Sequence, residues 1–362
     1  MSNDRVINKI YVQPLGLLKG LTVSCENFKK IASGSIYFST LKVIIRSVDD
    51  IKEEIISVAD LPSYLEASSY DVRNDIIRLL HNIESKRPVL KLANGLELNW
   101  NKPIIQGVLN VTPDSFSDGG QYHDIEKSIS HAREMVLAGA EIIDIGGEST
   151  KPGAKPVSID EEKHRVIPVI KELNDLKIPL SIDSRNSEVM EKAISDGVHI
   201  INDVSALSHD PESIKIVKKC GVPVILMHAQ GTPDIMQDSP KYNDVLLDIY
   251  DYLEAQINFC LEAGIAKNKI IIDPGIGFGK TLSHNLNILA NLAIFHGLGV
   301  PLLIGVSRKS FIGEITGEGA AENRFPGSIA AALTCLDQGA QIIRVHDVAQ
   351  TKQALSVWYA IH

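Results

Sequence analysis

The feature that most constrains this chain is a repeat of short apolar runs, each followed by a longer segment with helical periodicity. Eight such runs occur, at residues 104–110, 142–147, 179–184, 200–205, 222–228, 270–275, 301–307 and 342–347. This alternation is typical of successive βα units built around a parallel sheet. We expect helices between the runs, at residues 125–138, 160–176, 188–196, 245–263 and 329–338 among others.

The polar ends of these runs favour a closed barrel over an open sheet. An open, doubly wound sheet that binds a nucleotide would show a glycine fingerprint after its first strand, and Asn-Val-Thr-Pro-Asp stands there instead. A barrel gathers the carboxyl ends of all eight strands on one face, where such enzymes have their sites. We therefore predict a (β/α)8 TIM barrel with chemistry at Asn110, Glu148, Asp183, Asn202, His228, Asp273, Ser307 and His346, which end or directly follow the runs.

The first 91 residues do not follow the repeat. Residues 6–18 and 35–46 are expected to be strands, whereas 48–58 and 70–83 have helical spacing. These segments predict a small α+β extension over residues 1–91, with no motif that indicates its role, and a barrel domain over residues 92–362. Residues 92–98, with Asn94-Gly95 at their centre, predict a tight hairpin that closes the bottom of the barrel.

Composition excludes several classes of function. The formal net charge of −9 gives no basic field for nucleic-acid binding, and no apolar run approaches the roughly 20 residues needed to cross a bilayer. Neither a C-x-x-C nor a His-Glu-x-x-His motif is present, so a zinc site built by the protein is not expected. These features indicate a cytoplasmic protein with reduced thiols at Cys25, Cys220, Cys260 and Cys335.

Five sequence blocks carry a specific resemblance. A polar loop at 110–120, which includes Phe116 and Asp118, follows the first strand and is longer than a connection requires. The other blocks are Gly-Gly-Glu-Ser-Thr-Lys-Pro-Gly at 146–153, Asp-Pro-Gly-Ile-Gly-Phe-Gly-Lys at 273–280, Ser-Arg-Lys-Ser at 307–310 and Arg-Val-His-Asp at 344–347. In this order they closely resemble the dihydropteroate synthase family, over about residues 92–362.

The resemblance implies an activity and its partners. It implies a transferase that condenses 6-hydroxymethyl-7,8-dihydropterin pyrophosphate with 4-aminobenzoate, giving 7,8-dihydropteroate and pyrophosphate in folate biosynthesis. Pyrophosphate would leave first and the arylamine would attack second. The resemblance also implies Mg²⁺ with Asn110 as a metal ligand, a homodimer, and competition by sulfonamides.

Three polar residues at strand ends suit a pterin. Asp183, Asn202 and Asp273 end the third, fourth and sixth runs. A carboxylate accepts a pair of N–H groups, and an amide supplies one donor and one acceptor, which matches the edge of a pterin ring. Each of the three residues could instead cap the following helix. By resemblance they hold the pterin together with Lys309 and Met227.

Arg344 and His346 are two residues apart, so both side chains point to the same side of the last strand. By resemblance they bind the pyrophosphate, together with Thr150, Lys151 and Pro152. The family commonly has arginine at the position of Lys151. Lysine keeps the charge there but lacks the planar fork of a guanidinium.

The arylamine side of the site is assigned by resemblance as well. Phe278 offers an aromatic face to 4-aminobenzoate, near Ser310 and Lys309, although Ile276 departs from a frequent phenylalanine. Asp118 would face the cation that develops on the pterin, and Phe116 would exclude water. The catalytic assignments are therefore Asp118, Lys309, Arg344 and His346.

Two alternatives stay open. A pterin-binding methyltransferase would share the pterin carboxylates, but it has no use for the phosphate set or for the long first loop. A catalytically silent binding module would not need every motif residue to be intact. Release of pyrophosphate that depends on 4-aminobenzoate would separate the three functions.

Overall fold

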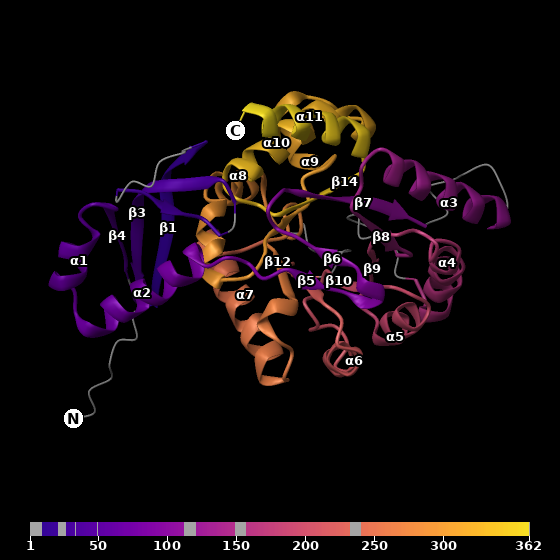
Figure 1. Ribbon diagram of the computed structural model, residues 1–362, viewed down its shortest axis with the longest axis horizontal. Coiled ribbons are helices and arrows are strands. Elements are labelled where there is room, and N and C mark those ends of the chain that lie inside the picture. Colours follow the sequence, from indigo (N-terminus) through magenta and orange to yellow (C-terminus); the bar gives the residue numbers. More distant parts are fainter. Residues whose placement is uncertain are drawn as a thin grey trace.

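The computed structural model describes residues 9–20, 27–32, 34–48, 50–111, 121–148, 157–231 and 240–361, with the backbone alone for 121–124. A β/α barrel occupies most of these ranges, and a small sheet with two helices lies beside it (Figure 1). None of the helices in the described ranges combines the length and apolar character that crossing a bilayer requires.

Eight parallel strands form the barrel, as predicted. From β7 to β12 each strand pairs with the next in the chain, and β14 pairs with both β7 and β13. A parallel bridge between Ile272 and Leu302 joins β12 to the segment before β13, so the sheet closes on itself. The strands are β7 (Ile104–Asn110), β8 (Ile142–Gly146), β9 (Leu180–Asp183), β10 (Ile200–Asp203), β11 (Val224–Met227), β12 (Ile270–Asp273), β13 (Leu303–Ile304) and β14 (Ile342–Val345).

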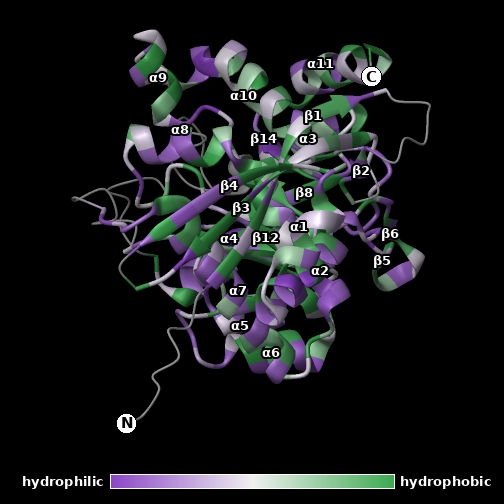
Figure 2. Ribbon diagram, turned by 90° about the vertical axis from the view of Figure 1, so that its left-hand side faces the viewer, coloured by the Kyte–Doolittle hydropathy of each residue, from purple (hydrophilic) through white to green (hydrophobic). Residues whose placement is uncertain are grey.

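Helices follow the barrel strands and turn apolar faces inward. In α4, for example, Val166, Val169 and Ile170 are buried at helical spacing, and Ser158 caps the helix by accepting a hydrogen bond from the Glu161 N–H. Figure 2 shows hydrophobic residues on the central strands and mixed character along the outer helices. The helices are α3 (Gln121–Leu137), α4 (Ile159–Glu172), α5 (Ser187–Ser195), α6 (Ser213–Cys220), α7 (Val245–Glu262), α8 (Leu282–Ala290), α9 (Ser310–Thr316), α10 (Phe325–Asp337) and α11 (Val348–Ile361), with 3₁₀ turns η3 (Lys267–Lys269), η4 (Leu292–Leu298) and η5 (Ala321–Arg324).

A hairpin covers the amino end of the barrel, as predicted. It consists of β5 (Leu90–Lys91), a turn η1 (Ala93–Gly95) and β6 (Glu97–Leu98), and Asn94 and Gly95 have φ angles of 58° and 73°. The predicted domain boundary between residues 91 and 92 falls inside this hairpin. Its apolar side chains and Trp100 form one buried cluster with residues near the amino ends of the strands: Ile104, Ile142, Ile200, Ile225, Ile271, Leu303 and Ile342.

The N-terminal extension confirms two predicted strands and one predicted helix. It contains β1 (Lys9–Lys19), β2 (Lys29–Lys30), β3 (Ile36–Arg46), β4 (Ile51–Ser57), α1 (Leu61–Ala67) and α2 (Tyr70–Glu84). The predicted helix at 48–58 is wrong, because Ile51–Ser57 pairs antiparallel with β3 as strand β4. A tight turn in which the Ser47 N–H donates to the Asp50 carbonyl at 2.8 Å reverses the chain here. The β3 edge then offers a full ladder of backbone partners, which outweighs the local helical spacing.

The extension packs on the outside of the barrel rather than standing apart from it. Its buried residues belong to the same hydrophobic core as the outer faces of the barrel strands. The Tyr11 hydroxyl donates to Asp251 of α7 at 2.8 Å, and Gln13 Nε2 donates to Asn291 Oδ1 at 2.8 Å. The Tyr11 ring also meets Tyr250 edge to face, with 5.2 Å between centroids.

Candidate active site

The polar residues predicted for the site lie together at the carboxyl ends of the barrel strands, here called the rim. Asn110 is in register with Gly146, Gly146 with Asp183, and Asp183 with Asn202. On the other side, Met227 is in register with Asp273. Parallel pairing therefore sets Asn110, Asp183 and Asn202 at one level, because register partners on neighbouring strands stand side by side. Asn202 pairs with Ile225, so Met227 and Asp273 lie two register positions further toward the carboxyl ends.

Arg344 bridges two carboxylates from different strands. Its Nη2 donates to Asp183 Oδ2 at 2.7 Å, and its Nε donates to Asp144 Oδ2 at 2.7 Å. Asn202 Nδ2 donates to the same Asp144 oxygen at 2.9 Å. One connected network thus joins Asp183, Arg344, Asp144 and Asn202, drawn from four strands. Such charge-assisted hydrogen bonds are about twice as strong as neutral ones and hold the side chains in fixed positions.

Burial raises the pKa of both rim carboxylates, Asp183 and Asp273. It raises the pKa of Asp183 to about 7, although the adjacent Arg344 opposes this rise. Burial raises the pKa of Asp273 to about 6. Two groups oppose this rise by stabilising the ionised form: the Gly275 N–H, which donates to Asp273 Oδ1 at 2.7 Å, and the Lys309 ammonium. Both carboxylates therefore have a pKa that lies close to physiological pH, which is common where charge is used for binding or catalysis.

Lys309 is positioned at the start of α9, with its ammonium over an aromatic ring. Its Nζ lies 4.0 Å from the centroid of the Phe278 ring, a cation–π contact. Burial and repulsion from Arg344 lower the pKa of Lys309 to about 8. Ser310 is the first residue of α9 and is exposed. The predicted neighbours Phe278, Lys309 and Ser310 are therefore brought together on this side of the rim.

A left-handed residue fixes the turn that carries Lys309. Arg308 has a φ of 60°, and its N–H donates to Ser328 Oγ at 2.8 Å. Its guanidinium forms a two-pronged bond with Asp347, at 2.6 and 3.0 Å. These contacts tie the turn after β13 to the start of α11, so a strained backbone conformation is held by its neighbours.

His346 faces the site as a neutral ring. Burial, together with Arg344 and Arg308, lowers its pKa to about 3. Its backbone N–H donates to Ser307 Oγ at 3.1 Å, and its Nδ1 lies 3.0 Å from the same oxygen. Because that oxygen already accepts the backbone proton, its hydroxyl proton is available for Nδ1. In the tautomer in which Nδ1 accepts this proton, Nε2–H is a neutral donor toward a ligand.

The glycine-rich segment after β12 is anchored from below by Lys280, which the sequence analysis did not single out. Lys280 is buried, and its Nζ lies 2.9 Å from both the Phe278 carbonyl oxygen and His228 Nδ1. Burial lowers its pKa to about 7. A Cβ on Gly275 would stand 1.9 Å from the His228 carbonyl oxygen, so no side chain fits there. His228 is buried, with its ring nitrogen Nδ1 next to Lys280.

Asp144 is the other residue that sequence reasoning missed. It interrupts an apolar strand, Ile-Ile-Asp-Ile-Gly, and is fully buried. A lone acidic residue inside a buried strand requires partners, and that signal alone could have marked Asp144. Five predicted site residues, Phe116, Asp118, Thr150, Lys151 and Pro152, lie outside the described residues.

The metal assignment rests on one amide. Among the described residues, no group of three or more His, Cys, Asp or Glu side chains could hold a metal ion. Asn110 Oδ1 and Asp183 Oδ2 would each lie 3.8 Å from a Cβ built on Gly146, so the Asn110 amide oxygen faces the site. One hard oxygen ligand of this kind fits Mg²⁺ that takes most of its shell from phosphate and water.

Comparisons with known proteins agree with this geometry. The family model described as "Pterin binding enzyme" matches residues 106–346 of the chain. The dihydropteroate synthase of Escherichia coli strain K12 is 48% identical over 266 residues, which cover 73% of this chain and 94% of that protein.

Two crystal structures are also similar, each 45% identical in sequence with a TM-score of 0.72. The Yersinia pestis dihydropteroate synthase with a sulfonamide drug complex matches 76% of this chain and 99% of its own. The Xanthomonas albilineans dihydropteroate synthase with 4-aminobenzoic acid matches 76% and 98%. The chain therefore belongs to the pterin-binding enzyme family and, within it, to the dihydropteroate synthases.

Proposed function

We infer that this enzyme joins 6-hydroxymethyl-7,8-dihydropterin pyrophosphate to 4-aminobenzoate, releasing pyrophosphate and 7,8-dihydropteroate, with the rim residues in the roles given below. One observation carries the assignment. Asp183, Asn202 and Arg344 form one hydrogen-bonded network through Asp144, and Asp273 and Lys309 interact electrostatically with it. A donor-rich heterocycle needs this set of acceptors and donors at one place.

The pterin ring occupies the part of the rim bordered by Asp183, Asn202 and Asp273. The two carboxylates accept its N–H groups when they are ionised. The amide of Asn202 adds a directional contact, and Met227, in register with Asp273, supplies an apolar wall. Lys309 stands on the side where the pterin and the arylamine meet.

The pyrophosphate is assigned to His346, Arg344 and the loop residues Thr150, Lys151 and Pro152. Arg344 keeps Nη1 for an anion, because Nε and Nη2 already hold Asp144 and Asp183. The neutral His346 ring donates from Nε2 without adding charge. Asn110 would hold Mg²⁺, which supplies charge neutralisation on the departing phosphate oxygens when it is bound.

The reaction then needs little acid–base chemistry from the protein. The C–O bond at the pterin methylene breaks, and its electron pair leaves with pyrophosphate. The cation that remains is faced by Asp118, and Phe116 shields it from water. The amine of 4-aminobenzoate forms the C–N bond and releases a proton. Phe278 and Lys309 hold the arylamine ring, and Ser310 at the start of α9 binds its carboxylate.

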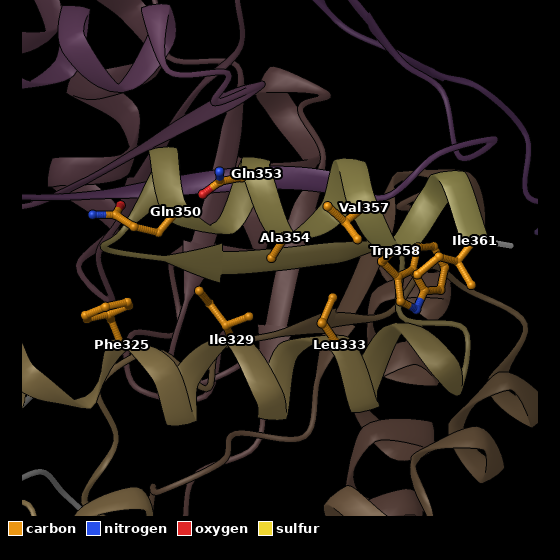
Figure 3. Close-up of a pocket in the computed structure, with 9 residues that line it drawn as sticks. All are labelled: Phe325, Ile329, Leu333, Gln350, Gln353, Ala354, Val357, Trp358 and Ile361. Atoms are coloured by element: carbon orange, nitrogen blue, oxygen red, sulfur yellow. The ribbon is translucent and has the colours of Figure 1, made fainter.

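We further assign the enzyme to the cytoplasm as a homodimer. The described cysteines are unpaired, which suits a reducing compartment. For the dimer, α10 and α11 form an open groove of about 480 Å³ whose lining is mostly apolar (Figure 3). Phe325, Val357 and Ile361 in this groove are 41%, 57% and 71% exposed. Association of two copies through this face would cover these side chains.

The proposed function is tested with the Asp183→Ala variant. We expect it to lose measurable binding of 6-hydroxymethylpterin in calorimetry while it keeps its fold, because Arg344 still has Asp144 as a partner. The matched control is Asp175→Ala, which removes an exposed carboxylate that pairs with Arg133 at 2.9 Å. Pterin affinity equal to that of the wild type in Asp183→Ala would refute the assignment, as would absence of pyrophosphate release by the wild-type enzyme.

A further inference from the structure

Asp144 lies one layer below the rim, and its carboxylate accepts hydrogen bonds from Ser181, Asn202 and Arg344. Its register partner on β9 is Ser181, two residues before Asp183, so Asp144 lies deeper in the barrel than the rim residues. Asp144 Oδ1 accepts from Ser181 Oγ at 2.5 Å, and Oδ2 accepts from Arg344 Nε and Asn202 Nδ2. The side chain is fully buried, so its partners take the place of water.

The direction of each bond at Asp144 is fixed by chemistry. Arginine Nε and an amide nitrogen only donate, so both contacts at Oδ2 require an acceptor. Ser181 Oγ already accepts from Gln106 Nε2 at 2.9 Å, and its own proton is therefore free to go to Asp144 Oδ1. All three neighbours donate toward this carboxylate.

The consequence reaches the ligand through Asn202. An amide can turn by 180° and exchange its donor and acceptor at little steric cost. Asp144 removes that freedom, because only the NH₂ end can face a carboxylate. The NH₂ end is thus held toward the inside of the barrel. No described residue donates to Asn202 Oδ1, and this oxygen remains the acceptor for a ligand.

We propose that Asp144 is a positioning residue, which fixes the amide of Asn202 so that its carbonyl oxygen accepts an N–H group of the pterin. This proposal rests on the proposed function of the site. The second partner of Asp144, Arg344, is oriented in the same way: Nε is held inside the barrel, Nη2 pairs with Asp183, and Nη1 is left for substrate. Asp144 itself touches no reacting atom.

The test compares two substitutions at the same position. Asp144→Ala removes the acceptor and should weaken binding of 6-hydroxymethylpterin roughly 10- to 30-fold. Asp144→Asn keeps an oxygen at the Oδ2 position, because its NH₂ can face Ser181, whose own proton can turn to the Ile143 carbonyl oxygen, 3.4 Å away. We therefore expect Asp144→Asn to restore affinity to within about threefold of the wild type. In both variants the KM for 4-aminobenzoate should stay near the wild-type value.

A double-mutant comparison separates a positioning role of Asp144 from a purely structural one. The positioning role predicts the following results. Asp144→Ala should cost less pterin affinity in an Asn202→Ala background than in the wild type, because part of its effect passes through that amide. Ser181→Ala, which leaves both bonds at Oδ2, is the matched control and should bind pterin like the wild type. Equal losses in the two backgrounds, or equal damage from Asp144→Ala and Asp144→Asn, would overturn the proposal.

A measurement on the unmutated enzyme keeps the test independent of folding of the variants. With ¹⁵N-labelled asparagine, the side-chain amide of Asn202 is assigned by its absence in Asn202→Ala. One of its protons should exchange slowly with solvent before any ligand is added. Exchange of both protons at the rate of an exposed amide would sink the proposal. If wild-type enzyme binds no pterin at all, the proposed function fails instead, and the two failures are thereby distinguished.

Discussion

Arg344 is held from two sides by carboxylates of different strands, and this limits what its charge can do. A guanidinium paired with Asp144 and Asp183 is largely neutralised before substrate arrives. Removal of one carboxylate would leave a buried charge with half its compensation, so such a variant should fold but should be less stable than the wild type. Arg344 therefore acts as a structural centre of the rim, in addition to its proposed role as a ligand for phosphate.

The pKa of Asp273 predicts how pterin binding depends on pH. Its pKa is raised to about 6 by burial, and an ionised carboxylate forms above that pH. Because the ionised form is proposed to accept the pterin N–H groups, affinity should fall as the pH drops from 8 to 5. Asp273 alone should contribute about tenfold for each pH unit below its pKa, in addition to the contribution of Asp183. Calorimetric titration of 6-hydroxymethylpterin between pH 5 and 8.5 measures this.

The control for this pH series is Asp273→Asn, which has no carboxylate to titrate. It should bind more weakly at high pH and lose the decline near pH 6, while any titration of the pterin itself appears in both proteins. A pH profile of Asp273→Asn that matches that of the wild type would mean that another group is responsible. Asp183, with a pKa raised to about 7, is the next candidate.

Among the elements, the segment between β12 and α8 is held in part by the buried side chain of Lys280. Lys280 Nζ contacts the Phe278 carbonyl oxygen, and Phe278 in turn lies under the Lys309 ammonium. Lys280→Met should leave the carbonyl oxygen without its donor, lower the free energy of unfolding by roughly 1–3 kcal/mol, and raise the KM for 4-aminobenzoate several-fold. Chemical denaturation and steady-state kinetics measure the two effects.

An exposed lysine provides the comparison for Lys280. Within the described part of the chain, Lys215 on α6 pairs with the nearby Glu212 alone, and its side chain is 69% exposed. Lys215→Met should therefore change neither stability nor KM beyond error. If Lys280→Met kept both the stability and the KM of the wild type, the anchoring role of Lys280 would be wrong.

Sequence patterns predicted elements best where period and polarity agree. Each predicted run combines apolar residues with a polar residue at or just after its end, because the strands are buried on two faces and their carboxyl ends lead into the polar site. A helix was predicted in place of strand β4 because Val48, Ile51, Ile55 and Ile56 have helical spacing. The factor that decides for a strand is tertiary, since it is the open edge of β3. The sequence could mark Asp144 as an acidic residue inside an apolar strand, but its role, like that of Lys280, could not be predicted, because it depends on a partner that is distant in sequence.

At the scale of the whole molecule, the groove between α10 and α11 predicts the state of association. Val357→Glu places a charge in the middle of this apolar face and should convert a dimer to a monomer in sedimentation or light-scattering measurements. The matched control is Leu137→Glu on α3, because Leu137 is 89% exposed and lies outside the groove. A wild-type chain that is already monomeric at micromolar concentration would contradict the dimer.

The extension also shares its core with the barrel, and this predicts that the two fold together. Tyr11 is fully buried against Tyr250, which stacks on Phe295 at 6.3 Å between centroids, and Asn82 Nδ2 donates to the Gly297 carbonyl oxygen at 2.8 Å. Deletion of residues 1–88 would uncover these aromatic rings on α7 and η4 while it spares the hairpin that begins at Leu90. We expect the truncated chain to aggregate or to melt well below the full-length enzyme.

Two point variants show whether loss of this packing, rather than the truncation itself, lowers the stability of the enzyme. Tyr11→Ala removes a buried ring and should lower the free energy of unfolding by about 3–5 kcal/mol, whereas Tyr70→Ala, at a tyrosine that is 76% exposed, should have little effect. Because the described site residues all belong to the barrel and none to the extension, kcat of Tyr11→Ala measured below its melting temperature should stay near the wild-type value. A soluble truncated enzyme with the melting temperature of the full chain would contradict this prediction. It would mean that contacts of the extension with α7 and η4 do not stabilise the barrel.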